Sequence, residues 1–460
     1  MPGTFGGLTT AINALNTHRN LLEVAGQNVA NANTPGYSRQ RADLAAIGGQ
    51  GQPAIYALWQ GAGSGVAVQD IVRVRDAFTD ARDRTEHARG GYLDGMQTSL
   101  DQVEQLINEP SDQGLQAQLH TFWSAWHEVA NSPGNLPVRT QMLGQAQTVA
   151  IALNDANNGL NAIWATTRGQ LDAQVQDINV TANSIAELNQ AVVRARTSGT
   201  GGNELADRRD QLVLHLADVA GATAQPRADG SVDVFISGST LVSGQSVRPL
   251  VAAGANTLPG ATSAPVTLTW SDTGTALGPT SGAVAATMES LTTTLPGVRD
   301  SLDSVAGTLA STVNGQHALG YDLNGDPGGT FFAGTGAADI RVAITDPKLV
   351  AASSTPGGTL DGDNADAMAL LSGAATGPDT TYKTFVADLG STASTIHQRS
   401  QMQSSLTQAA DAEVTAQSGV SLDEEMTDML RFQRGYEAAS RVLTSLDSAL
   451  DTLINHTIGF

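Results

Sequence analysis

The sequence predicts a mainly α-helical protein with a β-rich insert, built as an elongated rod of long helices whose two ends pair like a coiled coil. Three observations predict this architecture. Apolar heptad repeats occupy both ends of the chain, helical periodicity dominates between them, and a stretch rich in Gly, Thr, Ser and Val interrupts the helical pattern. We therefore expect nested domains, with the termini innermost and a small β domain at the far end.

The first predicted element is a helix with its own seven-residue register. Its seam, the row of apolar residues that a partner helix would cover, comprises Leu8, Ile12, Leu15, Leu22 and Val29. The pattern stops in the segment NVANANTPGYSR. Pro35 disfavours the α conformation of Thr34, and Gly36 permits a reversal of the chain, so the helix ends within this segment.

A connector and a helical rod follow. Residues 41–75 are rich in glycine, and the segment starting at Val66 alternates like a β-strand. Helical patterns then cover 76–107, with a break expected at Gly90-Gly91, and 115–130. They continue over 137–157, 160–196 and 203–220 as separate helices. Helices of this length joined by short loops predict a bundle over 41–219, completed by the returning segment 380–414.

The inserted outer domain is expected between residues 220 and 379. Asp229-Gly230 reads as a hairpin turn, and the alternating VTLTW reads as a strand. Helical character returns over 282–316. A short strand is expected from Asp339 and a short helix near 365–371, before the long helix 380–416 leads back along the rod.

The last helix, from Ser421 to Ile454, is the most regular element. Ser421 and Glu424 form a capping box, and only Gly435 opposes helix formation, by about 1 kcal/mol relative to alanine. The seam persists for more than four heptads and consists of Leu422, Met429, Phe432, Tyr436, Ala439, Leu443, Leu446, Leu450 and Leu453.

The two end seams are expected to form one assembly domain, residues 1–40 with 415–460. Neither helix can bury its apolar seam alone in water. One interpretation is an antiparallel hairpin that only closes a domain. The other is that both helices also bury against copies of the same chain.

Both ends resemble the signatures of the bacterial flagellar axial proteins. The N-terminal motif is matched by Asn28, Asn31, Thr34, Pro35, Gly36 and Tyr37, and the C-terminal signature by residues that include Glu424, Glu425, Met426, Gln433, Tyr436 and Arg441. Residues 122–150 and 203–219 further resemble the rod segments of the hook-associated members of that family, which join the hook to the filament.

This resemblance implies a structural, non-enzymatic, self-assembling protein of the bacterial flagellum that serves motility. Its implied partners are copies of itself, the flagellar hook protein, a second hook-associated junction protein and a flagellar export chaperone. The implied route is type III export of the unfolded chain, with folding on assembly. We expect the chaperone to contact the exposed apolar row Leu443, Leu446, Leu450 and Leu453, because it lacks a partner before assembly. The alternatives are a flagellar scaffold that displays a binding or antigenic module, another axial protein such as the hook protein, and a secreted hydrolase.

Composition restricts the function further. The net charge of −21 and a total of two lysines argue against a nucleic-acid partner, because phosphate binding needs clustered Lys and Arg. No cysteine is present, so thiolate metal sites and cysteine nucleophiles are excluded. No segment is apolar enough to suggest a membrane span, and the N-terminus lacks the basic region of a secretory signal.

We predict no catalytic, cofactor or metal site. Asp322, Asn324 and Asp326 have the spacing of an EF-hand loop, but Pro327 replaces its glycine and Ala333 its bidentate glutamate, which favours a tight polar turn. His120 and His127 stand seven apart on one helical face, and packing among the nearby tryptophans is the better explanation. Neither a nucleophile elbow nor a phosphate-binding loop is present.

Overall fold

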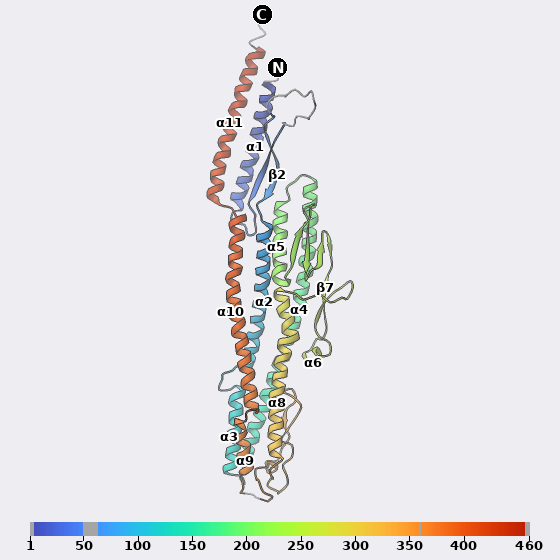
Figure 1. Cartoon of the computed structure of the whole chain (residues 1–460), viewed down its shortest axis with the longest axis vertical. Helices are drawn as coiled ribbons and strands as arrows, with labels where there is room; N and C mark the ends of the chain where they lie inside the picture. Colours follow the sequence, from blue (N-terminus) through green and yellow to red (C-terminus); the bar gives the residue numbers. More distant parts are fainter. Residues whose placement is uncertain (1–3, 49–62, 358–359, 456–460) are drawn as a thin grey trace.

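The computed structural model describes residues 4–48, 63–357 and 360–455, and it shows a long, narrow rod with both termini at one end (Figure 1). The chain runs down the rod and returns, as the sequence predicts. The helices, in chain order, are α1 (Thr4–Asn31), α2 (Ala77–Ile107), α3 (Leu115–Asn131), α4 (Leu136–Thr197), α5 (Asn203–Ala220), α6 (Leu258–Ala261), α7 (Gly282–Glu289), α8 (Leu295–His317), α9 (Asp363–Ala369), α10 (Pro378–Ser418) and α11 (Leu422–Asn455). The mainly α, elongated fold is thus confirmed.

In the part of the chain that the structure describes, ten short strands form four antiparallel sheets. β1 (Gln40–Ala46) pairs with β2 (Val66–Arg73), with a register shift between Asp43 and Leu44. The largest sheet has the order β3-β4-β5-β6. Its strands and those of the two remaining pairs are β3 (Thr223–Pro226), β4 (Val232–Ile236), β5 (Ser239–Ser243), β6 (Ser246–Val247), β7 (Leu250–Ala253) with β8 (Thr267–Trp270), and β9 (Phe332–Ala333) with β10 (Arg341–Val342).

Two expected helix breaks do not occur. α2 continues through Gly90-Gly91 and α4 continues through Gly159, so each is one helix. In both cases the glycine admits a neighbouring element. A methyl group at Gly91 would lie 2.3 Å from the Asp218 carbonyl oxygen of α5, and one at Gly159 would lie 2.3 Å from Leu106 of α2. Close helix packing therefore outweighs the cost of glycine in a helix, about 1 kcal/mol each.

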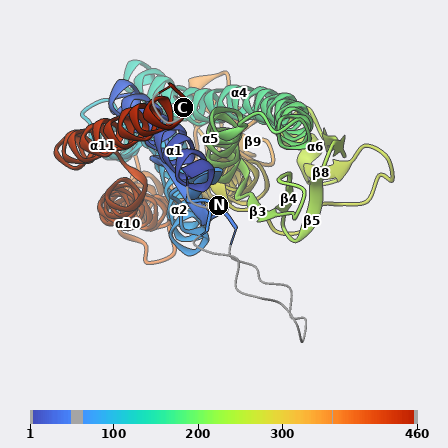
Figure 2. The same ribbon diagram turned by 90° about the horizontal axis from the view of Figure 1, so that it is seen from above.

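The β strands also differ from their expected position. β3–β8 lie beside α4 and α5 along the middle of the rod, and the far end is formed by α3, α9 and the ends of α8 and α10 (Figures 1 and 2). Two asparagines of α4 hold the strands there. Asn179 donates to the Leu250 carbonyl at 2.8 Å and accepts from its amide at 2.9 Å, and Asn189 does the same with Val232 at 2.8 and 3.0 Å. These paired amide contacts satisfy backbone groups of Leu250 on β7 and of Val232 at the start of β4.

The rod core is continuous from the strands to the far end. An aromatic cluster fills the far end, with ring centroids of neighbouring rings 4.8–6.4 Å apart; it comprises Phe122, Trp123, Trp126, Phe331 and Phe332. α7 and α8, which follow the strands in sequence, pack along α2, α4 and α10 as rod helices. The segment Ser290–Thr294 between them forms a π-helical turn just before Pro296, which has no amide hydrogen to donate. None of the helices in the described residues has an apolar stretch long enough to cross a membrane.

Candidate functional site: the terminal helix pair and its junction with the rod

α1 and α11 form an antiparallel pair at one end of the rod, which we call the terminal pair (Figure 1). A methyl group at Gly7 would lie 3.4 Å from Leu446, and one at Gly435 would lie 2.4 Å from the His18 ring. Asn28 donates to Glu425 at 3.1 Å. The partners advance along α1 as they recede along α11, which fixes the antiparallel register. Gly435 is thus the position where the His18 ring approaches α11 most closely.

The two predicted seams face one another, although a single chain covers them only in part. Ala439 is buried, and the partly buried residues are Leu8, Leu15, Leu22 and Val29 of α1 and Met429, Phe432, Tyr436, Leu443, Leu446 and Leu450 of α11. Ile12 and Leu422 remain 43% and 49% exposed. The side chain of Leu453 lies outside the described residues. The pairing of the seams is what the heptads predict, and their role in assembly stays a prediction.

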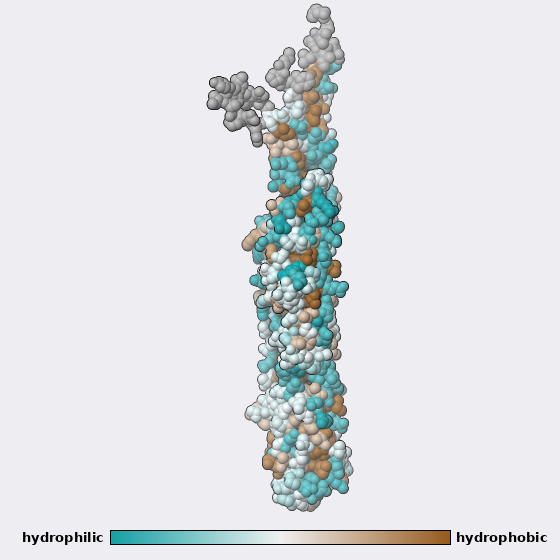
Figure 3. All heavy atoms as spheres, turned by 90° about the vertical axis from the view of Figure 1, so that its right-hand side faces the viewer, coloured by the Kyte–Doolittle hydropathy of each residue, from teal (hydrophilic) through white to brown (hydrophobic). Residues whose placement is uncertain are grey.

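α11 also carries large apolar residues outside the seam. Met426, Leu430 and Val442 are 50–55% exposed, and none of them belongs to the predicted seam. In the space-filling view, brown apolar atoms stand among teal ones over the terminal pair at the upper end of the rod (Figure 3). Because a thin helix pair offers little interior, about half of each of these side chains stays uncovered within the described part of one chain.

The terminal pair joins the rod through a cluster of polar residues that we call the junction: Asn28, Ser38, Arg39, Arg73, Asp207, Asp210 and Glu425. Asn28 lies at its centre and is 1% exposed. Its amide nitrogen donates to the Gln40 carbonyl at 2.9 Å and to Glu425. Its amide oxygen accepts from the Tyr37 hydroxyl and the Gln40 amide, both at 2.9 Å. One side chain therefore ties α1, β1 and α11 together. Burial, with the nearby Asp207 carboxylate, raises the pKa of Tyr37 to about 12, so its hydroxyl stays protonated as a donor.

Arg39 connects the start of α11 to the rod. Its guanidinium donates to Glu425 at 2.7 Å and to Glu424 at 2.9 Å. Its backbone amide donates to the Ser418 carbonyl at the end of α10, and its carbonyl accepts from Val74, both at 2.8 Å. The side chain of Glu425 is 4% exposed and that of Glu424 is 63% exposed, so the first pair is the stronger one.

α5 forms the rod side of the junction. Ser38 donates its hydroxyl to Asp207 at 2.7 Å, and Arg73 donates to both Asp207 and Asp210 at 2.8 Å. Burial acts to raise the pKa of Asp210, but Arg73 and Arg209 outweigh it and hold that pKa below its usual range. The Asp210 carboxylate is therefore charged at neutral pH, and the bonds from Arg73 to both carboxylates hold β2 against α5.

The Thr34-Pro35-Gly36 turn makes a direct contact with α5. Gln211 donates to the Pro35 carbonyl at 2.7 Å, and a methyl group at Gly36 would lie 1.9 Å from the same amide nitrogen. Gly36 has a φ of +75°, a conformation that costs other residues about 1–2 kcal/mol. Thr34, for its part, donates to Asn31 at 3.2 Å inside the turn.

We expect Gly36→Ala to lower the free energy of unfolding by about 1–2 kcal/mol, since alanine must adopt positive φ and displace Gln211. Urea denaturation measures the change. Adding Gln211→Ala removes the steric conflict and leaves the backbone cost, so the double variant should recover only part of the loss. Gly144→Ala in α4 is the control, because nothing lies within 4 Å of the added methyl group. A Gly36→Ala protein as stable as the parent would contradict this reading of the turn.

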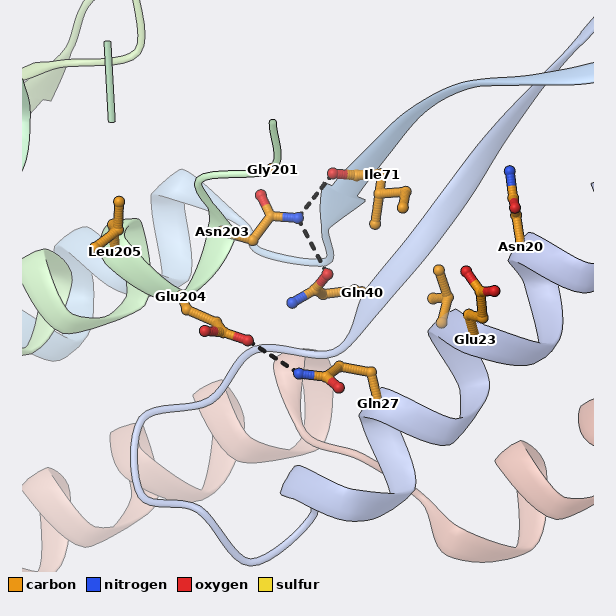
Figure 4. Close-up of a pocket in the computed structure, with 10 residues that line it drawn as sticks. Asn20, Glu23, Gln27, Gln40, Ile71, Gly201, Asn203, Glu204 and Leu205 are labelled. Carbon is orange, nitrogen blue, oxygen red and sulfur yellow. Dashed lines mark hydrogen bonds between the residues drawn. The ribbon is translucent and has the colours of Figure 1, made fainter. Parts of the chain in front are cut away.

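An open groove of about 510 Å³ lies between the outer face of α1 and the start of α5 (Figure 4). Gln27 of α1 donates across it to Glu204 at 2.9 Å, and Asn203 donates to the Ile71 carbonyl at 2.8 Å and to Gln40 at 3.2 Å. Hydrogen bonds therefore bridge the groove, and together with the junction they fix α1 to the rod.

The residues weighed for metal binding in the sequence have other roles. Asp322 accepts from the amides of Asn324 and Asp326 at 2.8 and 3.0 Å, which makes the tight polar turn that was expected. His120 and His127 are both exposed, and packing among the tryptophans is therefore the wrong explanation for them. His127 lies 3.4 Å from Asp366 of α9.

Sequence reasoning found the α1 and α11 contributions to the junction and missed the rest. Arg39, Arg73, Asp207 and Asp210 come from segments far apart along the chain, so no local pattern joins them. One sequence observation points to them, namely that three arginines flank the connector at 39, 73 and 75 in a strongly acidic chain, where each needs a carboxylate partner.

Comparison with known families gives a consistent result along the chain. Residues 100–332 match the flagellar hook-associated protein FlgK helical domain. Residues 8–37 match the flagella basal body rod protein family, and residues 414–456 match the flagellar basal body rod FlgEFG protein C-terminal family. The two terminal matches coincide with α1 and α11.

Individual relatives extend over nearly the whole chain. Flagellar hook-associated protein 1 of Bacillus subtilis is 31% identical over 99% of both chains, and that of Escherichia coli is 24% identical over 97% of this chain and 99% of the relative. The structure of the flagellar hook junction protein FlgK from Burkholderia pseudomallei aligns with a TM-score of 0.64 at 17% identity. It covers 74% of this chain and 99% of its own, which shows a shared fold.

Proposed function

Because the chain belongs to the flagellar hook-associated protein 1 (FlgK) family, we propose that this structural protein of the bacterial flagellum joins the hook to the filament by self-assembly through its terminal pair. The relatives that it resembles are flagellar structural proteins. The family matches favour this role over that of the hook protein.

The observation that carries the proposal is the incomplete cover of the terminal pair. Ile12, Leu422, Met426, Leu430 and Val442 stay 43–55% exposed in one chain. Burying the exposed half of such a side chain against a neighbour contributes about 1 kcal/mol each. Several such residues per subunit supply a driving force for adding copies side by side, and α11 offers them over most of its length.

The junction converts this contact into a defined geometry. Asn28, Arg39 and Glu425 fix the terminal pair to the rod, so a pair seated against its neighbours also orients the rod of the same chain. We propose the nested organisation that follows. Residues 1–40 with 415–460 form the assembly domain, and 41–219 with 380–414 form the rod. Within the expected insert, 220–379, the strands β3–β8 lie beside the rod, whereas α7 and α8 pack as rod helices.

The proposed partners are copies of the chain, the hook protein on one side and a second hook-associated junction protein on the other. We also propose that the chain is exported unfolded by the flagellar type III system and folds its ends on assembly. In the folded chain Leu443, Leu446 and Leu450 face α1 and are partly buried. An export chaperone that binds this row therefore binds before α1 and α11 have paired.

The test is whether the purified chain adds to the tips of isolated flagellar hooks, compared with the chain cut after Ala416. We expect the full chain to decorate the tips and the shortened chain to leave them bare. Near-UV circular dichroism controls for folding, because Trp123, Trp126, Trp164 and Trp270 all lie in the rod or the insert and are buried. Bare tips with both chains, together with a stable folded monomer, would overturn the proposal and favour a scaffold that displays a binding module.

A further inference from the structure

α2 and α10 run side by side along the rod and are joined mainly by polar contacts over the half nearer the terminal pair (Figure 1). Arg82 pairs with Glu413 at 2.7 Å, and Gln403 donates to the carboxylate of Glu86 at 2.7 Å. Asp83 and His87 of α2 and Asp411 of α10 lie next to these two bridges. The bridges hold the backbones of the two helices in fixed register at this level.

These three side chains have the chemistry and spacing of a metal site. Within the described residues, one potential ligand atom from each of Asp83, His87 and Asp411 lies within 4.8 Å of the others. His87 Nε2 is 3.1 Å from Asp411 Oδ1 and 3.8 Å from Asp83 Oδ1. Ligand atoms bound to one ion at about 2.0–2.2 Å stand roughly this far apart, so small side-chain rotations would complete the geometry.

A second observation points to a ligand at this position. Asp83 is only 5% exposed, and its Oδ1 atom is buried without a hydrogen-bond partner. A buried acceptor that points toward an imidazole and a second carboxylate, and that satisfies none of its hydrogen bonds, is costly. A cation bound there would remove that cost.

The surroundings suit a bound cation. Asp83 and His87 are four residues apart on one face of α2, so they project together. The side chains of His87 and Asp411 are 23% and 52% exposed, which leaves a path for entry and room for a water ligand. The two carboxylate ligands would neutralise a divalent ion.

We propose that Asp83, His87 and Asp411 bind a divalent transition metal such as Zn²⁺ and thereby cross-link α2 to α10 below the terminal pair. One imidazole with two carboxylates suits Zn²⁺, which accepts nitrogen and oxygen ligands in a four-coordinate site with water as the fourth ligand. Mg²⁺ and Ca²⁺ prefer all-oxygen sites and bind less well here.

The test is calorimetric titration of the metal-free full-length chain with Zn²⁺. We expect one site per chain, with affinity reduced at least about 100-fold by Asp83→Asn and by His87→Gln, since loss of even a supporting residue costs about 10–100-fold. The matched controls are Asp388→Asn, which removes an exposed carboxylate from another part of α10, and His215→Gln. His215 contacts Asp177 at 2.8 Å but belongs to no three-ligand group in the described residues. Both controls should bind like the parent.

The visible absorption of bound Co²⁺ provides an independent test of the site in the parent protein. Bound in a four-coordinate nitrogen and oxygen site it gives visible absorption bands, which Zn²⁺ should abolish by displacing it. Absence of a saturable site, equal binding in the Asp83→Asn and His87→Gln variants, or equal affinity for Mg²⁺ would each overturn the proposal. If a variant is unfolded by circular dichroism, the Co²⁺ spectrum of the parent chain decides the question.

Discussion

Replacing Glu425 by alanine is expected to loosen the terminal pair from the rod by about 3 kcal/mol. Breaking a buried ion pair typically costs about 3–5 kcal/mol, because the partner is left buried and unpaired. The Glu425 side chain is 4% exposed and that of Arg39 is 28% exposed, so solvent recovers part of the loss and the lower end applies. Asn28 also loses its hydrogen bond to Glu425. Amide hydrogen exchange along α1 and α11 measures the local free energy of opening.

Glu424→Ala is the matched control for this prediction. Glu424 precedes Glu425, carries the same charge and pairs with the same Arg39, but its side chain is 63% exposed. An exposed pair contributes about 0–1 kcal/mol, so exchange in the terminal pair should hardly change. Equal effects of the two replacements would mean that the junction does not depend on the buried carboxylate.

Leu443→Asp is expected to stop incorporation into hook tips while leaving the rod folded. Leu443 lies on the α11 seam and is partly buried against α1. An aspartate there places an unpaired charge between the two helices, at a cost of about 3 kcal/mol, or roughly a hundredfold in the population of the closed pair. Leu15→Asp acts on the opposite seam and should give the same result. Tip decoration followed by electron microscopy measures incorporation.

Thr444→Asp is the control, because Thr444 adjoins Leu443 but is exposed on the outside of α11. It adds the same charge without entering the seam. Near-UV circular dichroism of all three variants should match the parent, because the buried tryptophans lie away from the terminal pair. Normal incorporation of both seam variants would contradict assembly through α1 and α11.

The sequence is most informative where structure follows from local pattern. The heptads of α1 and α11, the stop at Pro35-Gly36 and the hairpin at Asp229-Gly230 all lie where periodicity and turn chemistry place them. Each seam also predicts the other as its partner, because each is an apolar row that needs to be covered by a second apolar row. The pairing of the two ends could therefore be predicted, although its register could not.

The remainder depends on contacts between distant segments. Gly91 and Gly159 look like helix breakers, and only the approach of Asp218 and Leu106 explains why the helices continue. In the sequence, Asn179 and Asn189 are ordinary polar residues of a long helix. Their role as anchors of the strands is visible only in the folded structure. The strands therefore lie along the rod and not at its far end.

The candidate metal site likewise combines a local sequence pattern with a contact between distant segments. Asp83 and His87 are four residues apart, a spacing that a helix places on one face, so this half was visible in the sequence. Asp411 is separated from His87 by 324 residues, and only the return of α10 beside α2 brings it close. A prediction of no metal site follows naturally when just two ligands can be placed together.

The bond between Asn28 and Glu425 joins residues 397 positions apart. Contacts of such long range form late, because closing the intervening chain costs entropy that nearby contacts do not. In a truncated chain, or in one whose export is not yet complete, α1 has no α11 with which to pair. In the proposed assembly, the terminal pair would therefore act as a test of completeness, because only subunits that possess both ends would form the surface that the next subunit binds.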